Sequence, residues 1–399
     1  MKACWQKKRL GDLCEVIAGQ SPAGNFYNAE GRGMPFYQGK KEFGEKFIGP
    51  PTRWTAQITK VAKRGDILMS VRAPVGPVNF ATETICIGRG LASIRSKAAL
   101  QSKFLFYQLL HLRPLIAGRE GAVFASINKS EIENLQIALV EKAEQQRIVA
   151  ILDEAFAGIA TAKANAEKNL QNARGIFESQ LQAIFTDCGK TWKLRTLEDI
   201  ATTFGRGKSK HRPRNAPHLY GGRYPFVQTG DIRRAGHIVT EYSQTYSEAG
   251  LAQSKLWPKG TICITIAANI AETAILGFDA CFPDSVIGIV ANPKEADTGF
   301  IEYLLQSFKA RIQAMGKGSA QANINLGTFE NERFPFPPLK EQQSIVADLH
   351  RLDEDTQRLA AIYERKLTAL DALKKSLLHC AFAGELTAGS AAKLVEAVA

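Results

Sequence analysis

The chain has 399 residues, of which 45% are hydrophobic and 23% charged, and this length allows two to three domains that each bury a core. The N-terminus has no apolar secretory segment and no stretch is apolar enough to cross a membrane, so we expect a cytoplasmic protein without membrane contact. The seven cysteines are scattered, without paired or metal-ligand spacing, which argues against disulfides and zinc and predicts buried thiols.

The net charge of +12 is unevenly distributed along the chain. Residues 1–140 carry +10 and residues 191–338 carry +4, whereas residues 141–190 and 339–399 each carry −1. Excess lysine and arginine confined to two blocks indicates a polyanionic partner. The alternative is a basic surface that serves only solubility.

One sequence pattern occurs twice, in the same order. The matching pairs are Trp5, Leu10 and Asp12 with Trp192, Leu197 and Asp199; Pro35, Phe36 and Gln38 with Pro225, Phe226 and Gln228; the segment from Gly65 with that from Gly260; and Glu144-Gln-Gln with Glu341-Gln-Gln. The spacing between copies grows from 187 to 197 residues along the chain. Ordered matches with slowly growing spacing indicate a duplicated domain with loop insertions.

Each copy begins with a block of mixed secondary structure. Short β-branched runs predict strands at 66–71, 83–87, 261–266 and 285–290, and apolar runs predict short helices at 104–110 and 300–305. We therefore expect a mixed α/β domain with a small twisted sheet in each block. The segment Phe334-Pro-Phe-Pro-Pro, which follows the second block, predicts a stiff connection, because proline is excluded from central strands.

Each copy ends in a long helix, from about Ala143 to Phe185 and from about Glu341 to Phe382. Heptad spacing predicts one apolar seam on each helix. The first seam is Ile148, Leu152, Ala155, Ile159, Ala162, Ala166, Asn169, Ala173, Ile176, Gln180 and Ala183, and the second is Ile345, Leu349, Leu352, Thr356, Leu359, Tyr363, Lys366, Leu370, Leu373, Leu377 and Cys380. An alanine-rich and a leucine-rich seam favour pairing of the two helices. The alternative is that each helix covers the sheet of its own block.

The resulting prediction is an α+β protein with a pseudo-twofold internal duplication. Two similar mixed α/β domains, at 1–140 and 191–338, are separated by long helices within 141–190 and 339–399 that form an antiparallel intramolecular coiled coil. The sequence contains no nucleotide-binding glycine loop, nucleophile elbow or zinc-protease motif. We therefore expect no catalytic centre, no bound cofactor and no metal site in this chain.

Candidate DNA contacts lie on loops that differ between the copies. The segment 205–214 is a glycine- and proline-interrupted basic loop suited to phosphates, although a solvated charged loop is the alternative. Glutamine and arginine also make paired hydrogen bonds to adenine and guanine edges. The candidates are Gln38, Lys40, Lys41, Arg119, Arg206, Lys208, Lys210, Arg212, Arg214, Gln228, Arg233, Arg234, Lys317, Ser319 and Gln321.

Together these motifs resemble the specificity subunits of type I restriction-modification systems. The resemblance rests on the paired tryptophan motifs, the Pro-Phe-x-Gln segments, the Gly-Asp-Ile-Leu strand at Gly65, the Ile-Asn loops, the Glu-Gln-Gln helix starts and the closing Ala381-Phe-Ala-Gly-Glu-Leu. It covers residues 5 to 387. Thr261 stands where the first copy has Asp66, which puts any shared role for that aspartate in doubt.

The resemblance implies two target-recognition domains that bind the two halves of an asymmetric double-stranded DNA site and are held apart by paired helices. It also implies two modification subunits that methylate adenine with S-adenosylmethionine, and two restriction subunits that use ATP and Mg²⁺. We expect the helix pair to hold the domains about one helical turn of DNA apart.

Three other interpretations stay open. The chain could serve a methylation-only or other phage-defence assembly. It could be a self-sufficient methyltransferase or nuclease, which cofactor binding by the purified chain would indicate. It could also be a coiled-coil scaffold, in which case DNA affinity would lack steep salt dependence and sequence preference.

Overall fold

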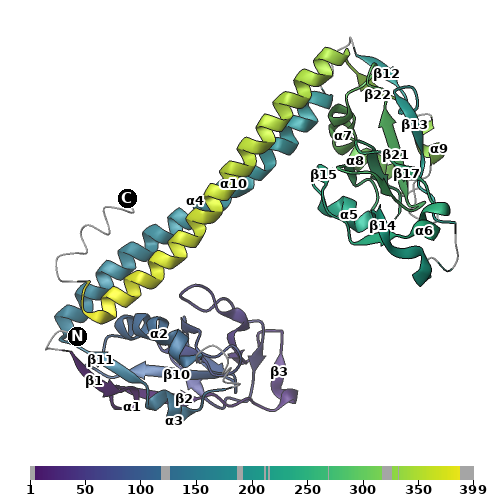
Figure 1. Ribbon diagram of the computed structural model, residues 1–399. Coiled ribbons are helices and arrows are strands. Elements are labelled where there is room, and N and C mark those ends of the chain that lie inside the picture. Colours follow the sequence, from purple (N-terminus) through teal and green to yellow (C-terminus); the bar gives the residue numbers. More distant parts are fainter. Residues whose placement is uncertain are drawn as a thin grey trace. The chain divides into compact units, whose positions relative to one another are not determined.

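The computed structural model describes residues 5–117, 126–186, 192–210, 213, 216–267, 269–316, 326–330 and 332–386. These residues form two compact units (Figure 1). The first consists of residues up to 167 together with those from 364 onward, and the second of residues 168–363. Residues of both long helices contribute to each unit.

The described residues of the first unit form three small sheets. Their strands, in spatial order, are β1 (Gln6–Arg9) and β11 (Gln136–Leu139); β2 (Cys14–Ala18), β10 (Leu91–Ser96), β7 (Ile67–Ser70) and β8 (Val78–Phe80); and β3 (Tyr27–Asn28), β5 (Trp54–Thr55), β4 (Met34–Tyr37), β9 (Ile85–Ile87) and β6 (Val61–Ala62). The short helices are α1 (Leu10–Leu13), α2 (Ser102–Ile116) and α3 (Lys129–Glu133), with 3₁₀ turns at Gly24–Phe26 and Lys40–Glu42.

The second unit repeats this plan. Its sheets are β12 (Lys193–Arg195) and β22 (Phe334–Phe336); β13 (Ala201–Arg206), β21 (Val286–Ala291), β18 (Ile262–Thr265), β19 (Thr273–Leu276) and β15 (Ile238–Val239); and β16 (Gln244–Tyr246), β14 (Tyr220–Phe226), β20 (Ala280–Cys281) and β17 (Leu256–Trp257). The short helices are α5 (Thr229–Arg234), α6 (Glu248–Ala252), α7 (Thr298–Ser307), α8 (Lys309–Gly316) and α9 (Leu326–Glu330), with a 3₁₀ turn at Pro217–Leu219.

Strand order confirms the duplication. The order β2-β10-β7-β8 in the first unit corresponds to β13-β21-β18-β19 in the second, and all neighbours in both runs are antiparallel. The described residues of each unit also form an equivalent parallel pair, β4 with β9 and β14 with β20, and in the second unit β15 is parallel to β19 as well. The fold is therefore α+β, as expected, but each block contains three small sheets where a single sheet was expected.

Equivalent aromatic contacts join the long helices to the two units. Trp5 and Phe382 both pack on Phe104, at ring-centroid distances of 6.4 Å and 5.5 Å. In the second unit, Trp192 and Phe185 pack on Phe300 at 6.0 Å and 5.4 Å. Each cluster thus combines the opening tryptophan of one copy with the last helical turn of the other copy.

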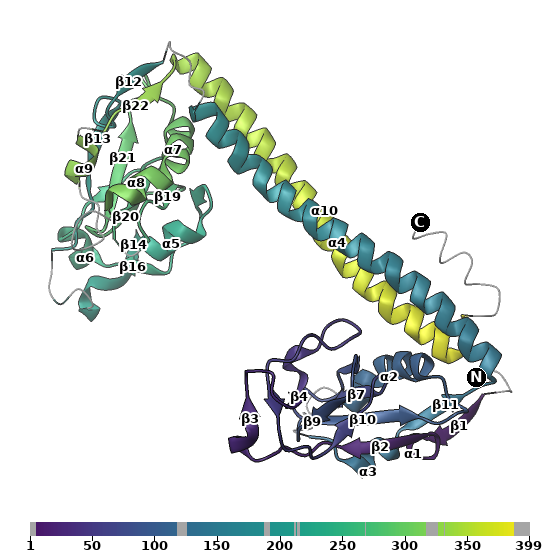
Figure 2. The same cartoon turned by 180° about the vertical axis from the view of Figure 1, so that it is seen from behind.

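The long helices are α4 (Lys142–Thr186) and α10 (Leu339–Ala383), 45 residues each. Figures 1 and 2 show them side by side. In the first unit, Lys163 pairs with Asp371 at 3.1 Å and Phe156 lies beneath the ammonium of Lys374 at 4.9 Å. Residue numbers fall on α4 as they rise on α10, so the helices run antiparallel, as expected for a pseudo-twofold duplication.

The heptad seams were partly wrong. Ile148, Leu152, Ile159, Ala166 and Ala173 are buried as expected. Further along α4 the expected seam residues Ile176, Gln180 and Ala183 are exposed, while Phe177, Leu181, Ile184 and Phe185 turn inward. Lys366 on α10 is exposed as well. An α-helix with 3.6 residues per turn drifts about 20° per heptad from a strict seven-residue repeat, which moves the buried face by one residue.

The proline-rich segment before α10 also differs from expectation. Phe334–Phe336 is a strand, β22, in which Pro335 lies opposite Leu194 of β12. A two-stranded sheet has only edge strands, so proline's missing N–H can face away from the partner. The segment is therefore a strand at a sheet edge.

Cys14, Cys86, Cys263 and Cys281 are buried and unpaired, and Cys380 is half-buried. Burial raises the pKa of the Cys14 thiol to about 12, so this thiol stays protonated. In the part of the chain that the structure describes, no helix is both long and apolar enough to span a membrane.

Candidate nucleic-acid interface

Three candidate contacts of the first unit lie together directly after β4. Gln38, Lys40 and Lys41 are exposed, and the two lysines lie in a 3₁₀ turn that ends at Glu42. The hydroxyl of Ser21 donates to Oε1 of Gln38 at 3.0 Å, which orients the amide. The structure thus places an oriented amide and two cations on one short segment.

The turn between β9 and β10 packs against Gln38 and adds a residue that the sequence analysis missed. An added Cβ atom on Gly90 would lie 2.5 Å from the main-chain oxygen of Gln38, so this position requires glycine, and one on Gly88 would lie 2.8 Å from Oε1 of Gln38 and displace that amide. Arg89 between them is exposed and its N–H donates to Oγ of Ser21 at 3.2 Å. Arg89 therefore lies beside Gln38, and the Gly-Arg-Gly sequence was the available signal.

The equivalent segment of the second unit forms α5. Asp231 accepts from the N–H of Gln228 at 2.8 Å and pairs with Arg234 at 2.6 Å, although Arg234 stays largely exposed. The amide of Gln228 donates to Gln244 at 2.6 Å, and Arg233 donates to Asn269 at 3.2 Å. Gln228, Arg233 and Arg234 are thus brought together and oriented by neighbouring side chains.

The basic loop after β13 contains one arginine that stabilises the loop and two exposed lysines. The Arg206 guanidinium donates to the main-chain oxygen of Asp284 at 2.8 Å and 2.5 Å, so it stabilises the loop. Lys208 and Lys210 are exposed. Lys255, which the sequence analysis missed, lies over the Trp257 ring at 3.6 Å, and burial together with repulsion from Lys208 lowers its pKa. Neighbouring cations that repel one another suit a polyanion.

The remaining candidates lie outside the described residues. They are Arg119, Arg212, Arg214, Lys317, Ser319 and Gln321.

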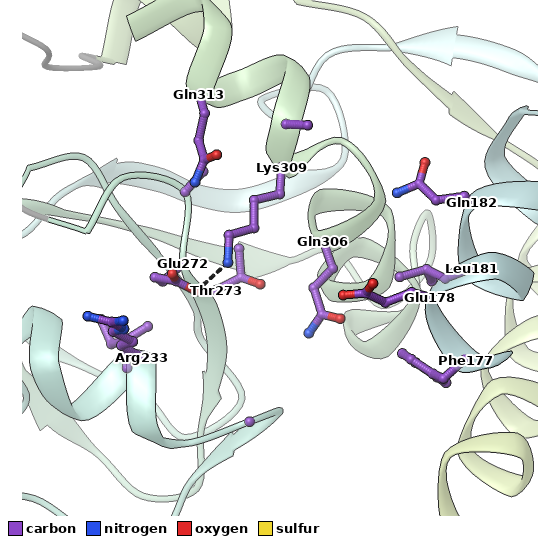
Figure 3. Close-up of a pocket in the computed structure, with 14 residues that line it drawn as sticks. Phe177, Glu178, Leu181, Gln182, Arg233, Glu272, Thr273, Gln306, Lys309 and Gln313 are labelled. Atoms are coloured by element: carbon purple, nitrogen blue, oxygen red, sulfur yellow. Dashed lines mark hydrogen bonds and ion pairs between the residues drawn. The ribbon is translucent and has the colours of Figure 1, made fainter. Parts of the chain in front are cut away.

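The second unit also contains a cavity of about 490 Å³ (Figure 3). Phe177, Leu181 and Gln182 of α4 form one wall, and residues of α5, α7, α8 and the segment 271–273 form most of the rest. Lys309 and Glu272 lie 2.7 Å apart across it. A lysine–glutamate pair and several amides line this cavity, and the hydroxyl of Thr273 donates to the buried carboxylate of Glu302 at 3.0 Å. Among the described residues, no group of three or more His, Cys, Asp or Glu side chains could hold a metal ion.

Asp66, the aspartate of the Gly-Asp-Ile-Leu strand at Gly65, has a structural role. Asp66 is buried and accepts from Ser93 at 2.8 Å and from Arg95 at 2.9 Å and 2.8 Å. By strand register, Thr261 and Val290 occupy the positions of Asp66 and Arg95 in the second unit. Since both partners of the ion pair are replaced, the two units share no function for this aspartate.

Comparison with known proteins identifies both halves. The model of the type I restriction modification DNA specificity domain matches residues 3–171 and 189–365. The type I restriction enzyme MjaIX specificity subunit of Methanocaldococcus jannaschii is 22% identical over 96% of this chain and 93% of its own length. The EcoDI specificity subunit of Escherichia coli is 21% identical over 96% and 89%. A putative MjaX specificity subunit from M. jannaschii is 45% identical over 148 residues, which are 36% of this chain and 35% of that protein.

Solved structures share the fold. A chain from a structure of a type I R-M system, determined for its complex assembly and conformational transition, has a TM-score of 0.78 and 18% identity, covering 97% of this chain and 99% of its own. The HsdS subunit from Thermoanaerobacter tengcongensis has a TM-score of 0.66 and 17% identity, covering 97% and 98%. The chain therefore belongs to the family of type I restriction modification DNA specificity domains and contains two copies of that domain.

Proposed function

We propose that this protein is the DNA-specificity subunit of a type I restriction-modification complex and that each recognition domain binds one half of a bipartite double-stranded site. One observation carries the proposal: the same topology occurs twice, with different polar side chains at the equivalent segments 38–41 and 228–234. Two domains of one fold with different contact residues suit two different half-sites.

Catalysis belongs to partner subunits in this proposal. Two modification subunits bind the chain and methylate adenine with S-adenosylmethionine, and two restriction subunits add ATP- and Mg²⁺-dependent translocation and cleavage, all in the cytoplasm. An assembly that only methylates, or another phage-defence assembly, is the second candidate. Co-purification of the chain with the products of neighbouring genes separates these candidates.

Methylation mapping tests the recognition function. The chain is expressed with its modification subunits, and methylated adenines are located by single-molecule sequencing. The expected result is one motif with two specific parts separated by an unspecific spacer. A continuous motif, or no motif, would contradict the proposal.

The antiparallel helices support a further part of the proposal, that α4 and α10 set the spacer. One heptad added to each helix lengthens the pair by about 10 Å, close to three base pairs of DNA. The methylated motif should then keep its two parts and gain about three spacer base pairs. An unchanged spacer would show that the helices do not set the distance.

A further inference from the structure

In each unit, one basic side chain joins the segment with the proposed base contacts to a long helix. Nζ of Lys46 lies 2.6 Å from Oδ1 of Asp153 on α4. In the second unit, Nε2 of His237 lies 3.9 Å from Oδ2 of Asp353 on α10, and its Nδ1 lies 3.0 Å from Oε2 of Glu302 on α7. Both residues follow the candidate contact segments by only a few positions.

Backbone hydrogen bonds show that Lys46 and His237 occupy equivalent positions. The N–H of Phe80 donates to the main-chain oxygen of Lys46 at 2.9 Å, and the N–H of Ile275 donates to that of His237 at 2.8 Å. Phe80 and Ile275 are 195 residues apart, which is also the spacing between the Asp66 and Thr261 strands. The two side chains therefore leave matching points of the two domains.

The surroundings of the two side chains also correspond. Lys46 lies 5.4 Å from the ring of Tyr107 on α2, and His237 lies 4.8 Å from the ring of Tyr303 on α7. On each long helix an aspartate and an aromatic residue lie one turn apart, and their order along α10 is the reverse of their order along α4. Tyr107 contacts Phe156, one turn after Asp153, whereas Tyr303 contacts His350, one turn before Asp353. The contact between basic residue, tyrosine and helix carboxylate is thus retained although the sequence differs.

We propose that Lys46 and His237 are equivalent positioning residues that hold the DNA-contacting segment of each domain in a fixed orientation to a long helix. The link is a lysine–carboxylate ion pair in the first domain, and in the second it depends on protonation of a histidine. This inference rests on the proposed DNA contacts at 38–41 and 228–234.

Protonation of His237 is governed by the groups that face it. Glu302 is 1% exposed, and its Oε1 accepts from Thr273 at 3.0 Å and from Gln306 at 2.5 Å, two residues that also line the cavity in Figure 3. Asp353 faces His237 from α10, and the Phe177 ring faces it from α4 at 6.1 Å. The hydrogen bond to Glu302 raises the pKa of His237 against the opposing effect of burial.

The raised pKa of His237 determines the direction in which stability changes with pH. A histidine with a raised pKa stabilises the folded arrangement fully below its ordinary pKa of 6.5, and the contribution is lost as pH rises through the folded value. Lysine side chains keep their charge throughout this range. Only the second domain should therefore loosen its contact segment as pH rises.

The test compares the full-length wild type with His237→Lys, His237→Gln and, as a matched control in the first domain, Lys46→His. The probe is a pool of duplexes enriched by the wild type from a random-sequence library. The dissociation constant is measured at fixed salt from about pH 6 to about pH 8, the range in which histidine titrates. Wild-type binding should weaken severalfold as pH rises through this range, because His237 loses its charge. His237→Lys should remove this loss, His237→Gln should bind weakly at every pH, and Lys46→His should steepen the loss.

Hydrogen exchange without DNA gives an independent measurement. Amides of 229–239 should be more protected at pH 6 than at pH 8, with protection unchanged at 40–48; His237→Gln should abolish the difference. Equal pH profiles for DNA binding by the wild type, His237→Lys and His237→Gln would overturn the inference. If the library yields no enriched sequence, the proposed function fails. The hydrogen-exchange measurement then still decides whether His237 orders residues 229–239.

Discussion

Gln342 makes the same three hydrogen bonds in the second unit that Gln145 makes in the first. Both side chains are buried, at 1% and 0% exposure. Each amide oxygen accepts from the residue before a short helix, and each amide nitrogen donates to two main-chain oxygens. The partners are Gln101 (2.8 Å), Ala99 (3.0 Å) and Val140 (2.9 Å) for Gln145, and Asp297 (2.9 Å), Glu295 (3.3 Å) and Pro337 (2.9 Å) for Gln342. The first glutamine of each Glu-Gln-Gln motif therefore anchors its long helix to its own domain.

Gln145→Leu and Gln342→Leu should each lower the free energy of unfolding of their unit by about 2–3 kcal/mol, because each leaves buried main-chain groups without partners. Urea denaturation measures the loss. Gln146→Leu, on the exposed neighbouring position, is the control and should change the free energy by less than about 0.5 kcal/mol. Equal effects at Gln145 and Gln146 would contradict the anchoring role.

Asp66→Thr should destabilise the first unit by about 3 kcal/mol, because it leaves the half-buried Arg95 without its buried partner. The double variant Asp66→Thr with Arg95→Val copies the pair Thr261 and Val290 of the second unit. It should cost less than the sum of the single variants, with a coupling of about 1 kcal/mol or more. Additive losses would show that the two residues act independently.

Asp153 should stabilise the first unit in a pH-dependent manner. Burial opposes its ionisation, but hydrogen bonds from Lys103, Lys46 and Tyr107 outweigh burial and lower the pKa to about 2. The ionised carboxylate stabilises the folded unit fully above the ordinary pKa of 3.8, and this stabilisation is lost as pH falls through about 2. The stability difference between the wild type and Asp153→Asn should therefore shrink across this window. A constant difference would exclude ionisation as its cause.

Lys208→Gln and Lys210→Gln should each reduce the slope of log affinity for DNA against log salt by about one, as expected for loss of a phosphate contact. Lys375→Gln, an exposed change on α10 in a segment with no excess positive charge, should leave the slope unchanged. Arg206→Gln should instead lower the melting temperature, because it removes two hydrogen bonds to Asp284. If the three lysine variants gave equal slopes, the loop would not contact DNA phosphates.

Gln38→Ala should relax the base preference at one position of one half-site, and Gln228→Ala should do so in the other half-site. Each loss corresponds to about 1–3 kcal/mol of discrimination for a paired amide-to-adenine contact. Methylation maps of the variant complexes measure the change. Gln136→Ala, exposed on β11, is the control. If a single variant lost base preference in both half-sites, it would contradict the proposal that each domain binds one half-site.

Much of the architecture could be predicted from local pattern. The long helices begin and end within two residues of the expected positions, because an apolar stripe without proline specifies a helix over many turns. The buried face of α4 beyond Ala173 could not be predicted, because it depends on the drift of a real helix against its partners. Similarly, Phe334–Phe336 became a strand because β12, about 140 residues earlier in the chain, supplies an edge.

The sequence by itself determined the duplication, the two basic blocks and the candidate contact segments, because these depend on residue identity and order. The tertiary structure determined which partners the polar side chains contact. It assigned Arg206 and Asp66 to structural bonds, placed Arg89 beside Gln38, and brought His237 to Glu302. These partners lie from 29 to 78 residues apart in the chain. Only folding makes such distant groups neighbours, and the strength of a polar interaction depends on the burial that folding creates.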